Sequence, residues 1–314
     1  MSQVNAVAVT SAELGANAAP PEAIKAIPVR HWGRWVAAAV ILYLTAALIV
    51  SLVRNPNVDV KTIGEFLFKD LTLRGVVVTI ELTAVAMVIG MLGGTLLAVM
   101  RLSENRVLAW SAWVYIWFFR GTPVFVQILL FGFLGALYLK LPLGIPFTGI
   151  VFAEAETSRL VGATTAAILA LGLNEAAYAS EITRAGIISV DTGQTEAALS
   201  LGMSPALTMR RIILPQAMRM IVPPMGNETI SMLKTTSLVA VISGHEVMSN
   251  LQAAYSQNFK IIPLLLVACC WYLFLVTLLT IGQGYLERYF GRGFGTKESA
   301  IAEKKARKRE ASRV

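Results

Sequence analysis

Long apolar segments constrain the fold of this chain more than any other feature of its sequence. They cover residues 35–53, 75–100, 107–139, 159–187, 221–241 and 262–286, and only 15% of the 314 residues are charged. A soluble domain carries about 25% charged residues, whereas a helix that crosses a bilayer needs about 20 apolar residues in a row. Lipid offers the backbone no hydrogen-bond partners, so spanning segments of this length form helices. The sequence therefore predicts an all-α integral membrane protein with about six transmembrane helices.

The third apolar segment is too long for one straight crossing. Its middle reads Arg120-Gly121-Thr122-Pro123. Proline removes a backbone donor and clashes with the preceding helical turn, and glycine loosens a helix. We expect a break here, between an interfacial or half-buried piece and a full span.

Basic residues gather in the loops after the second and fourth segments and in the tail after the sixth. The positive-inside rule assigns such loops to the cytoplasm, which places both termini there if there are six spans. The opposite loops hold Lys140 and Lys260, and residues 54–74 are an exception with both basic and acidic residues. Residues 62–71 are expected to form an amphipathic helix on the outer surface.

Residues 196–215, EAALSLGMSPALTMRRIILP, form a polar stretch between two apolar segments. Charges, a glycine and two prolines exclude it from lipid, so it predicts a structured loop at the cytoplasmic surface. We expect a helix over residues 196–201, a chain reversal at Gly202, and a second helix with Ser204 as N-cap and Pro205 at its first position. Pro215 is expected to end or kink that second helix.

The spacing of Glu, Gly, Ile, Leu and Pro in this loop resembles the EAA loop of ABC importer permeases, a helix-turn-helix that docks into the ATPase subunit. Further stretches are similar to polar amino acid uptake permeases: FRGTPVFVQ (119–127), YASEITRAGI (178–187), LPQA (214–217) and GNETISMLKTTS (226–237). The resemblance covers residues 75–285. It implies a bacterial cytoplasmic-membrane subunit with a five-helix core, paired with a second copy or a related permease.

The same resemblance implies partners and energy coupling. ATPase subunits and an extracytoplasmic amino acid-binding protein would work with the chain to carry an amino acid across the bilayer. The residues implied in ATPase coupling lie within 191–218 and are Glu196, Ala197, Ala198, Gly202, Arg210, Arg211, Ile212, Leu214 and Pro215. Glu196 would pair with Arg210 or Arg211, or with a cation on the ATPase; the alternative is an ordinary cytoplasmic connector.

The chain lacks the G-x-x-x-x-G-K-[ST] phosphate loop, so ATP hydrolysis is not expected here. It is predicted not to be an enzyme and to bind no cofactor, with ATP and Mg²⁺ held by the partner ATPase. The two cysteines and two histidines do not have the spacing of a metal site. Basic aromatic motifs for nucleic acid are also absent. We therefore expect no catalytic residue, no metal and no nucleic-acid partner.

Four parts follow from these patterns. We expect a disordered cytoplasmic tail over residues 1–30 and an extra N-terminal transmembrane helix over 31–54. The permease core follows over 75–286, and a basic cytoplasmic tail over 287–314. The N-terminal tail and helix are where the chain departs from the family that it resembles.

Polar residues within predicted spans are costly and so mark candidate positions on a substrate pathway. They are Glu81, Arg120, Thr122, Asn174, Glu175, Asn227, Glu228 and Lys234, together with Gly121 for the free backbone N–H groups around it. A zwitterionic amino acid needs acceptors for its ammonium, such as Glu175 and Glu228, and donors for its carboxylate, such as Arg120 and Lys234. The alternative for each charge is internal pairing that holds the bundle or dimer together. Glu175 is the best clue to substrate and favours a cationic or polar amino acid.

One other class of function fits an apolar chain of this length: a stand-alone secondary transporter or channel for a small polar solute. It would predict inverted repeats and no docking hairpin. We find no internal repeat. The amino acid carried, and whether the dimer contains two copies or two related permeases, stay open at this level.

Overall fold

The computed structural model describes residues 32–145, 148 and 150–291, and it divides the chain into two units, residues 1–55 and 56–314. In the first unit, α1 (Trp32–Arg54) is a 23-residue apolar helix with no buried residue. The tail predicted over residues 1–30, and the basic tail beyond Gly291, lie outside the described residues.

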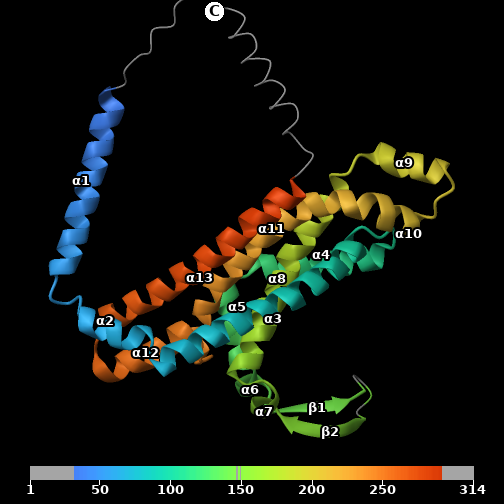
Figure 1. Cartoon of the computed structure of the whole chain (residues 1–314). Coiled ribbons are helices and arrows are strands. Elements are labelled where there is room, and N and C mark those ends of the chain that lie inside the picture. Colours follow the sequence, from blue (N-terminus) through green and yellow to red (C-terminus); the bar gives the residue numbers. More distant parts are fainter. Residues whose placement is uncertain (1–31, 146–147, 149, 292–314) are drawn as a thin grey trace, which may run out of the picture. The chain divides into compact units, whose positions relative to one another are not determined.

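The second unit is a helical bundle with one small hairpin (Figure 1). Its first half contains α2 (Val60–Leu67), α3 (Asp70–Arg101), α4 (Arg106–Gly121), α5 (Val124–Gly132), α6 (Leu134–Leu137), β1 (Lys140–Gly144), β2 (Val151–Glu156), α7 (Thr157–Leu160) and α8 (Ala163–Ile188). Its second half contains α9 (Thr192–Ser200), α10 (Pro205–Thr208), the π-helical turn η1 (Met209–Ile213), α11 (Leu214–Thr235), the 3₁₀ helix η2 (Thr236–Ile242), α12 (Val247–Asn258) and α13 (Ile261–Phe290).

The antiparallel β1–β2 hairpin is a departure from the expected all-helical fold. Lys140 pairs with Glu156 and Pro142 with Glu154 along its register. Two short strands joined by a loop leave the membrane-protein class unchanged, but no alternation strong enough to predict them stands out in the sequence.

By length and composition, three of the described helices can cross a membrane: α1, α3 and α13. The pair α4–α5 makes a fourth if it counts as one span, and it bends by 98° at the predicted break. The two remaining predicted spans correspond to α8, with 26 residues, and α11, with 22. They are long enough but not apolar enough, because they carry the polar residues discussed below.

Helices α3 and α8 pack closely and run in the same direction. The backbone at Gly90 lies against Glu175, and that at Gly94 lies against Ala179 and Ser180. A Cβ at either glycine would overlap these neighbours, so the small glycines allow the two helices to pack closely. Since the contacts advance along both helices together, the C-terminal ends of α3 and α8 lie at the same end of the bundle. The hairpin of α9 and α10 follows α8 at that end, which we call the coupling end (Figure 1).

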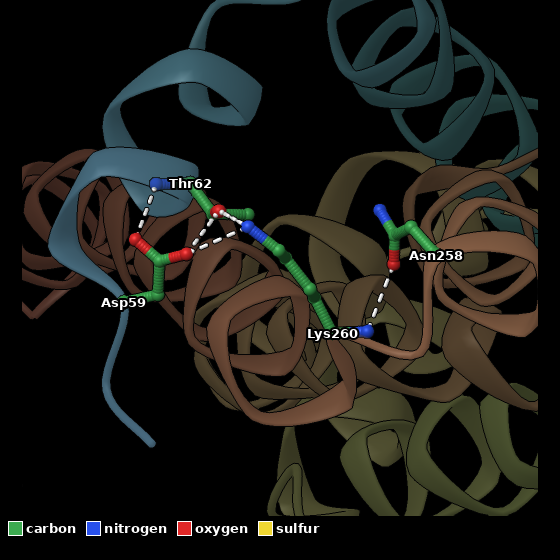
Figure 2. A network of polar contacts seen from close by, with 4 residues as sticks. All are labelled: Asp59, Thr62, Asn258 and Lys260. Atoms are coloured by element: carbon green, nitrogen blue, oxygen red, sulfur yellow. Dashed lines mark hydrogen bonds and ion pairs between the residues drawn. The ribbon is translucent and has the colours of Figure 1, made fainter. Parts of the chain in front are cut away.

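A polar network at the opposite end joins α2 to the start of α13 (Figure 2). The Oδ1 atom of Asp59 accepts from the backbone N–H of Thr62 at 3.1 Å and so caps α2. Its Oδ2 atom accepts from Lys260 Nζ at 2.8 Å and from the Thr62 hydroxyl at 2.6 Å. These bonds, that from Lys260 above all, hold the pKa of the Asp59 carboxyl well below its usual range. The helix expected over residues 62–71 is only partly present, because α2 ends at Leu67 and residues 70–71 already belong to α3. The network holds α2 to the start of α13.

Pro215 was expected to end or kink the second helix of the loop. It does not end it, because η1 runs directly into α11. The regular α-helical pattern is instead interrupted by the π-helical turn η1 immediately before Pro215. Pro223 and Pro224 lie inside α11. The helical segment from Pro205 therefore continues through the polar loop into the membrane region without a stop.

Candidate functional site

A cavity of about 580 Å³ lies where the α4–α5 break meets α8 and α11. Its polar lining comes from all these elements, with a few apolar residues between. The lining residues are Arg120, Gly121, Thr122, Pro123, Val124, Leu171, Asn174, Glu175, Tyr178, Glu228, Ser231, Met232 and Thr235. Glu175 is near the middle of α8, so the cavity is at mid-depth in the bundle.

The break between α4 and α5 leaves a backbone acceptor without its usual donor. In a continuous helix the carbonyl of Phe119 would accept from residue 123, which is a proline and has no N–H. Instead Gln127 Nε2 donates to this carbonyl at 2.9 Å and Asn174 Nδ2 donates at 3.0 Å. Asn174 Nδ2 also donates to Gln127 Oε1 at 3.1 Å. Two amide side chains thus replace the lost backbone bond and fix the bend against α8.

Glu175 is the most isolated polar group of the cavity. Its side chain is 4% exposed, and its Oε1 atom has no hydrogen-bond partner among the described residues. The neighbouring Gly90 backbone leaves just enough room for it. A buried acceptor without a partner is unfavourable, which makes this oxygen available to a donor that enters the cavity.

The other charged groups of the cavity are Arg120 and Glu228. The Arg120 guanidinium lies over the Tyr178 ring, 5.2 Å from its centroid, and is exposed. Glu228, Ser231 and Thr235 follow one another at helical spacing and present one polar face of α11 to the cavity. Two carboxylates and one guanidinium give the lining a formal charge of −1 with the carboxylates ionised. Such a lining can receive a cationic group and one carboxylate.

The structure brings together six of the nine predicted pathway residues: Arg120, Gly121, Thr122, Asn174, Glu175 and Glu228. The other three do not line the cavity. Glu81 is exposed on α3 and Lys234 is exposed on α11. Asn227 accepts from Gln283 Nε2 of α13 at 2.9 Å. Their positions along the helices place them on other faces. A prediction that selects every polar residue within a span does not distinguish these faces.

Sequence reasoning missed Tyr178, Ser231, Thr235 and the supporting Gln127. The first three follow a simple signal, since each is three or seven residues from a carboxylate on its own helix and so shares its face. The role of Gln127 was not signalled in this way, because it depends on a 98° bend that brings its amide back to Phe119.

The polar loop after α8 forms the predicted helical hairpin. Gly202 has a positive φ of 79° and reverses the chain, and the Ser204 hydroxyl accepts from Leu207 N as an N-cap. Ala198 is buried and Ile212 half-buried, so they hold the hairpin together.

The exposed members of the predicted coupling set are Glu196, Ala197, Gly202, Arg210, Arg211, Leu214 and Pro215. No ion pair among the described residues joins Glu196 to Arg210 or Arg211. Glu181 and Arg184 of α8 do form an ion pair, at 2.7 Å.

Comparison with known proteins agrees with this architecture. The family described as "Binding-protein-dependent transport system inner membrane component" matches residues 87–292. The arginine transport system permease protein ArgU of Corynebacterium glutamicum is 47% identical over 282 residues, covering 89% of this chain and 87% of the relative. The nopaline transport system permease protein NocM of Agrobacterium fabrum is 37% identical, with 65% of this chain and 80% of the relative covered.

A solved structure described as an amino acid ABC transporter with histidines is 35% identical, with a TM-score of 0.57, and 70% of this chain and 94% of that chain are covered. The methionine transporter MetNI in an inward-facing form shares the fold at 19% identity and a TM-score of 0.52. These matches support the permease interpretation over a stand-alone transporter or channel. The chain therefore belongs to the family of inner membrane components of binding-protein-dependent transport systems.

Proposed function

We propose that this permease forms one half of an ABC importer for amino acids and that its cavity selects cationic ones. The unpartnered Oε1 atom of Glu175 carries the proposal, because it offers a buried acceptor in a lining that has one more carboxylate than cations. An α-ammonium and a cationic side chain would be received by Glu175 and Glu228. The carboxylate of the amino acid would be received by Arg120 and by backbone N–H groups near Gly121.

The names of similar proteins support this substrate class. The relative that covers 89% of this chain is described as an arginine transport system permease, and a similar solved structure is described as holding histidines. Arginine and histidine both carry a basic side chain. A lining with a formal charge of −1 fits that shared chemistry.

Energy coupling is proposed to run through the hairpin of α9, α10 and η1. Separate ATPase subunits that hold ATP and Mg²⁺ would dock on its exposed residues, including Glu196 and Arg211. A second permease, either another copy or a related chain, would complete the pathway. An extracytoplasmic amino acid-binding protein would deliver substrate at the opposite end. Both termini would then lie in the cytoplasm of a bacterial cell.

Uptake of labelled arginine, lysine, histidine and glutamine into vesicles that contain the reconstituted importer tests the substrate class. We expect Glu175→Gln to raise the KM for the cationic amino acids about tenfold or more, since a charge-assisted bond contributes roughly 1.5–3 kcal/mol. Uptake of glutamine should change less. Unchanged preference in this variant would refute the role of Glu175.

Glu196→Lys tests the coupling separately. We expect it to remove ATPase association and uptake while leaving arginine binding to the permease intact. Lys61→Glu, on α2 at the opposite end, is the matched charge reversal and should keep the ATPase bound. ATPase association that survives Glu196→Lys would contradict the docking assignment.

A further inference from the structure

Two arginines flank a second concave site, at the coupling end and away from the central cavity. Arg101 is the last residue of α3 and Arg106 the first of α4. The short connection between these helices places both at a pocket of about 440 Å³, whose remaining walls are Ala109, Trp110 and Trp113. The pocket therefore combines two cations with an otherwise apolar lining.

Neither guanidinium has a counter-charge in the part of the chain that the structure describes. The ion pairs there involve five other basic residues, and no hydrogen bond or ring contact of Arg101 or Arg106 is found. Glu104, the acidic residue of the connecting loop, is exposed and does not line the pocket. Two adjacent cations without an anion favour a ligand that carries negative charge.

The length of α3 places this pocket at the level of lipid headgroups. Its 32 residues extend about 48 Å at a rise of 1.5 Å each. A bilayer is about 30 Å thick in its hydrocarbon core and about 40–45 Å with its headgroup regions. At the average tilt of about 20° for a transmembrane helix, α3 covers about 45 Å along the bilayer normal. Its C-terminal end therefore reaches the headgroup region, and Arg101 and Arg106 lie at that depth.

Two tryptophans of α4 suit the same depth. Trp110 and Trp113, four and seven residues after Arg106, are 68% and 43% exposed. Indole rings favour the membrane interface, where the ring lies among glycerol and upper acyl groups and the N–H meets water or headgroups. The indoles line an apolar recess directly beside the two guanidinium groups.

We propose that this pocket binds one anionic phospholipid of the leaflet at the coupling end. Arg101 and Arg106 hold the headgroup phosphate, and Trp110 and Trp113 contact its glycerol and first methylene groups. Charge complementarity argues for this occupant over a second copy of the chain, which would bring another pair of like charges to the site.

Native mass spectrometry of the purified full chain, released from a mixture of phosphatidylglycerol and phosphatidylcholine, tests the proposal. We expect wild type to retain phosphatidylglycerol in preference to phosphatidylcholine. R101Q/R106Q should weaken that retention about twenty-fivefold, since each basic residue near an anionic surface contributes about fivefold. R101K/R106K keeps both charges and should keep most of the preference, which separates charge loss from misfolding.

R219Q/R288Q is the matched control, because it removes two other basic residues near the coupling end and should retain the lipid like wild type. If R101Q/R106Q and R219Q/R288Q lose phosphatidylglycerol equally, the lipid is held by the general positive charge of the surface, and the proposed site is refuted. Equal retention of the two lipids by wild type, or binding of inorganic phosphate with no lipid preference, would refute it as well. A cysteine replacing Trp110 that crosslinks to the same position in a second copy would also overturn it, by showing that the permease partner covers this face.

Discussion

Asp59 and Glu175 are both carboxylates held by the bundle, but their surroundings are opposite. Asp59 accepts from the Thr62 backbone, the Thr62 hydroxyl and Lys260, all within 3.1 Å (Figure 2). Glu175 is far more buried and yet has an oxygen with no partner. The carboxylate with a full set of donors holds helices together. The one that lacks a donor is destabilising unless a ligand completes it, and so marks a site for function.

Gly90→Val should have the largest effect, and it tests how tightly the buried Glu175 is packed. A Cβ at this position would overlap the Glu175 side chain, and valine adds further bulk. We expect loss of transport and a decrease in stability of about 1–3 kcal/mol or more. Thermal unfolding in detergent measures the decrease. Gly282→Ala, at a helix position with open space, is the control and should be neutral or slightly stabilising. A well-folded, active Gly90→Val variant would contradict the close packing of α3 on α8.

Gln127→Leu removes one of the two amides that satisfy the Phe119 carbonyl. Gln127 is 2% exposed, so water does not readily replace its bond. We expect a loss of about 1–3 kcal/mol together with weaker substrate binding, since the bend that shapes the cavity loosens. Gln252→Leu changes an exposed glutamine of α12 in the same way and should leave both the melting temperature and uptake unchanged.

Glu175→Met sharpens the comparison because stability and function should move apart. An unbranched apolar side chain of similar length removes the unpartnered acceptor, so we expect a melting temperature equal to or above that of wild type. Uptake of cationic amino acids should be lost. A lowered melting temperature in this variant would mean that Glu175 holds the bundle together, as Asp59 does.

Asp59→Asn should give the smallest effect, a slight lowering of the melting temperature at neutral pH. The pKa of Asp59 is lower in the folded protein than in the unfolded chain. The stability that its charge contributes is therefore complete above the unfolded value of about 3.9 and is lost as the pH falls toward the folded value. The difference between wild type and variant should begin to shrink below about pH 4 and should vanish only near the lowered pKa of the folded protein. A difference that persists in acid would mean that geometry, not charge, is responsible.

Much of this architecture is predictable from sequence because single residues determine it. The run Gly121-Thr122-Pro123 favours a break in the helix, Gly202 permits the reversed chain, and Ser204 with Pro205 starts the next helix. The length and the high hydropathy of the apolar runs also locate α3 and α13. These signals act locally, so no knowledge of the fold is needed to read them.

Other features depend on neighbours that lie far away in the sequence. Whether Asn227 or Glu228 faces the cavity is a matter of one helical step on α11, and it is fixed by the bond of Asn227 to Gln283. Pro223 and Pro224 lie inside α11 rather than ending it, because packing against α13 and α8 outweighs the cost of two missing donors. The β1–β2 hairpin likewise lacks a strong local signal.

The parallel contact between α3 and α8 has a mechanical consequence. Glu175 is 13 residues before the end of α8 at Ile188, or about 20 Å along a rigid helix. A tilt of about 10° imposed at the hairpin would displace the carboxylate by about 3.5 Å by this geometry, the length of one hydrogen bond. Because Gly90 and Gly94 seat α8 directly on α3, the two helices would move together as one lever. A movement imposed at the hairpin would then change which protein atoms contact a molecule bound in the cavity.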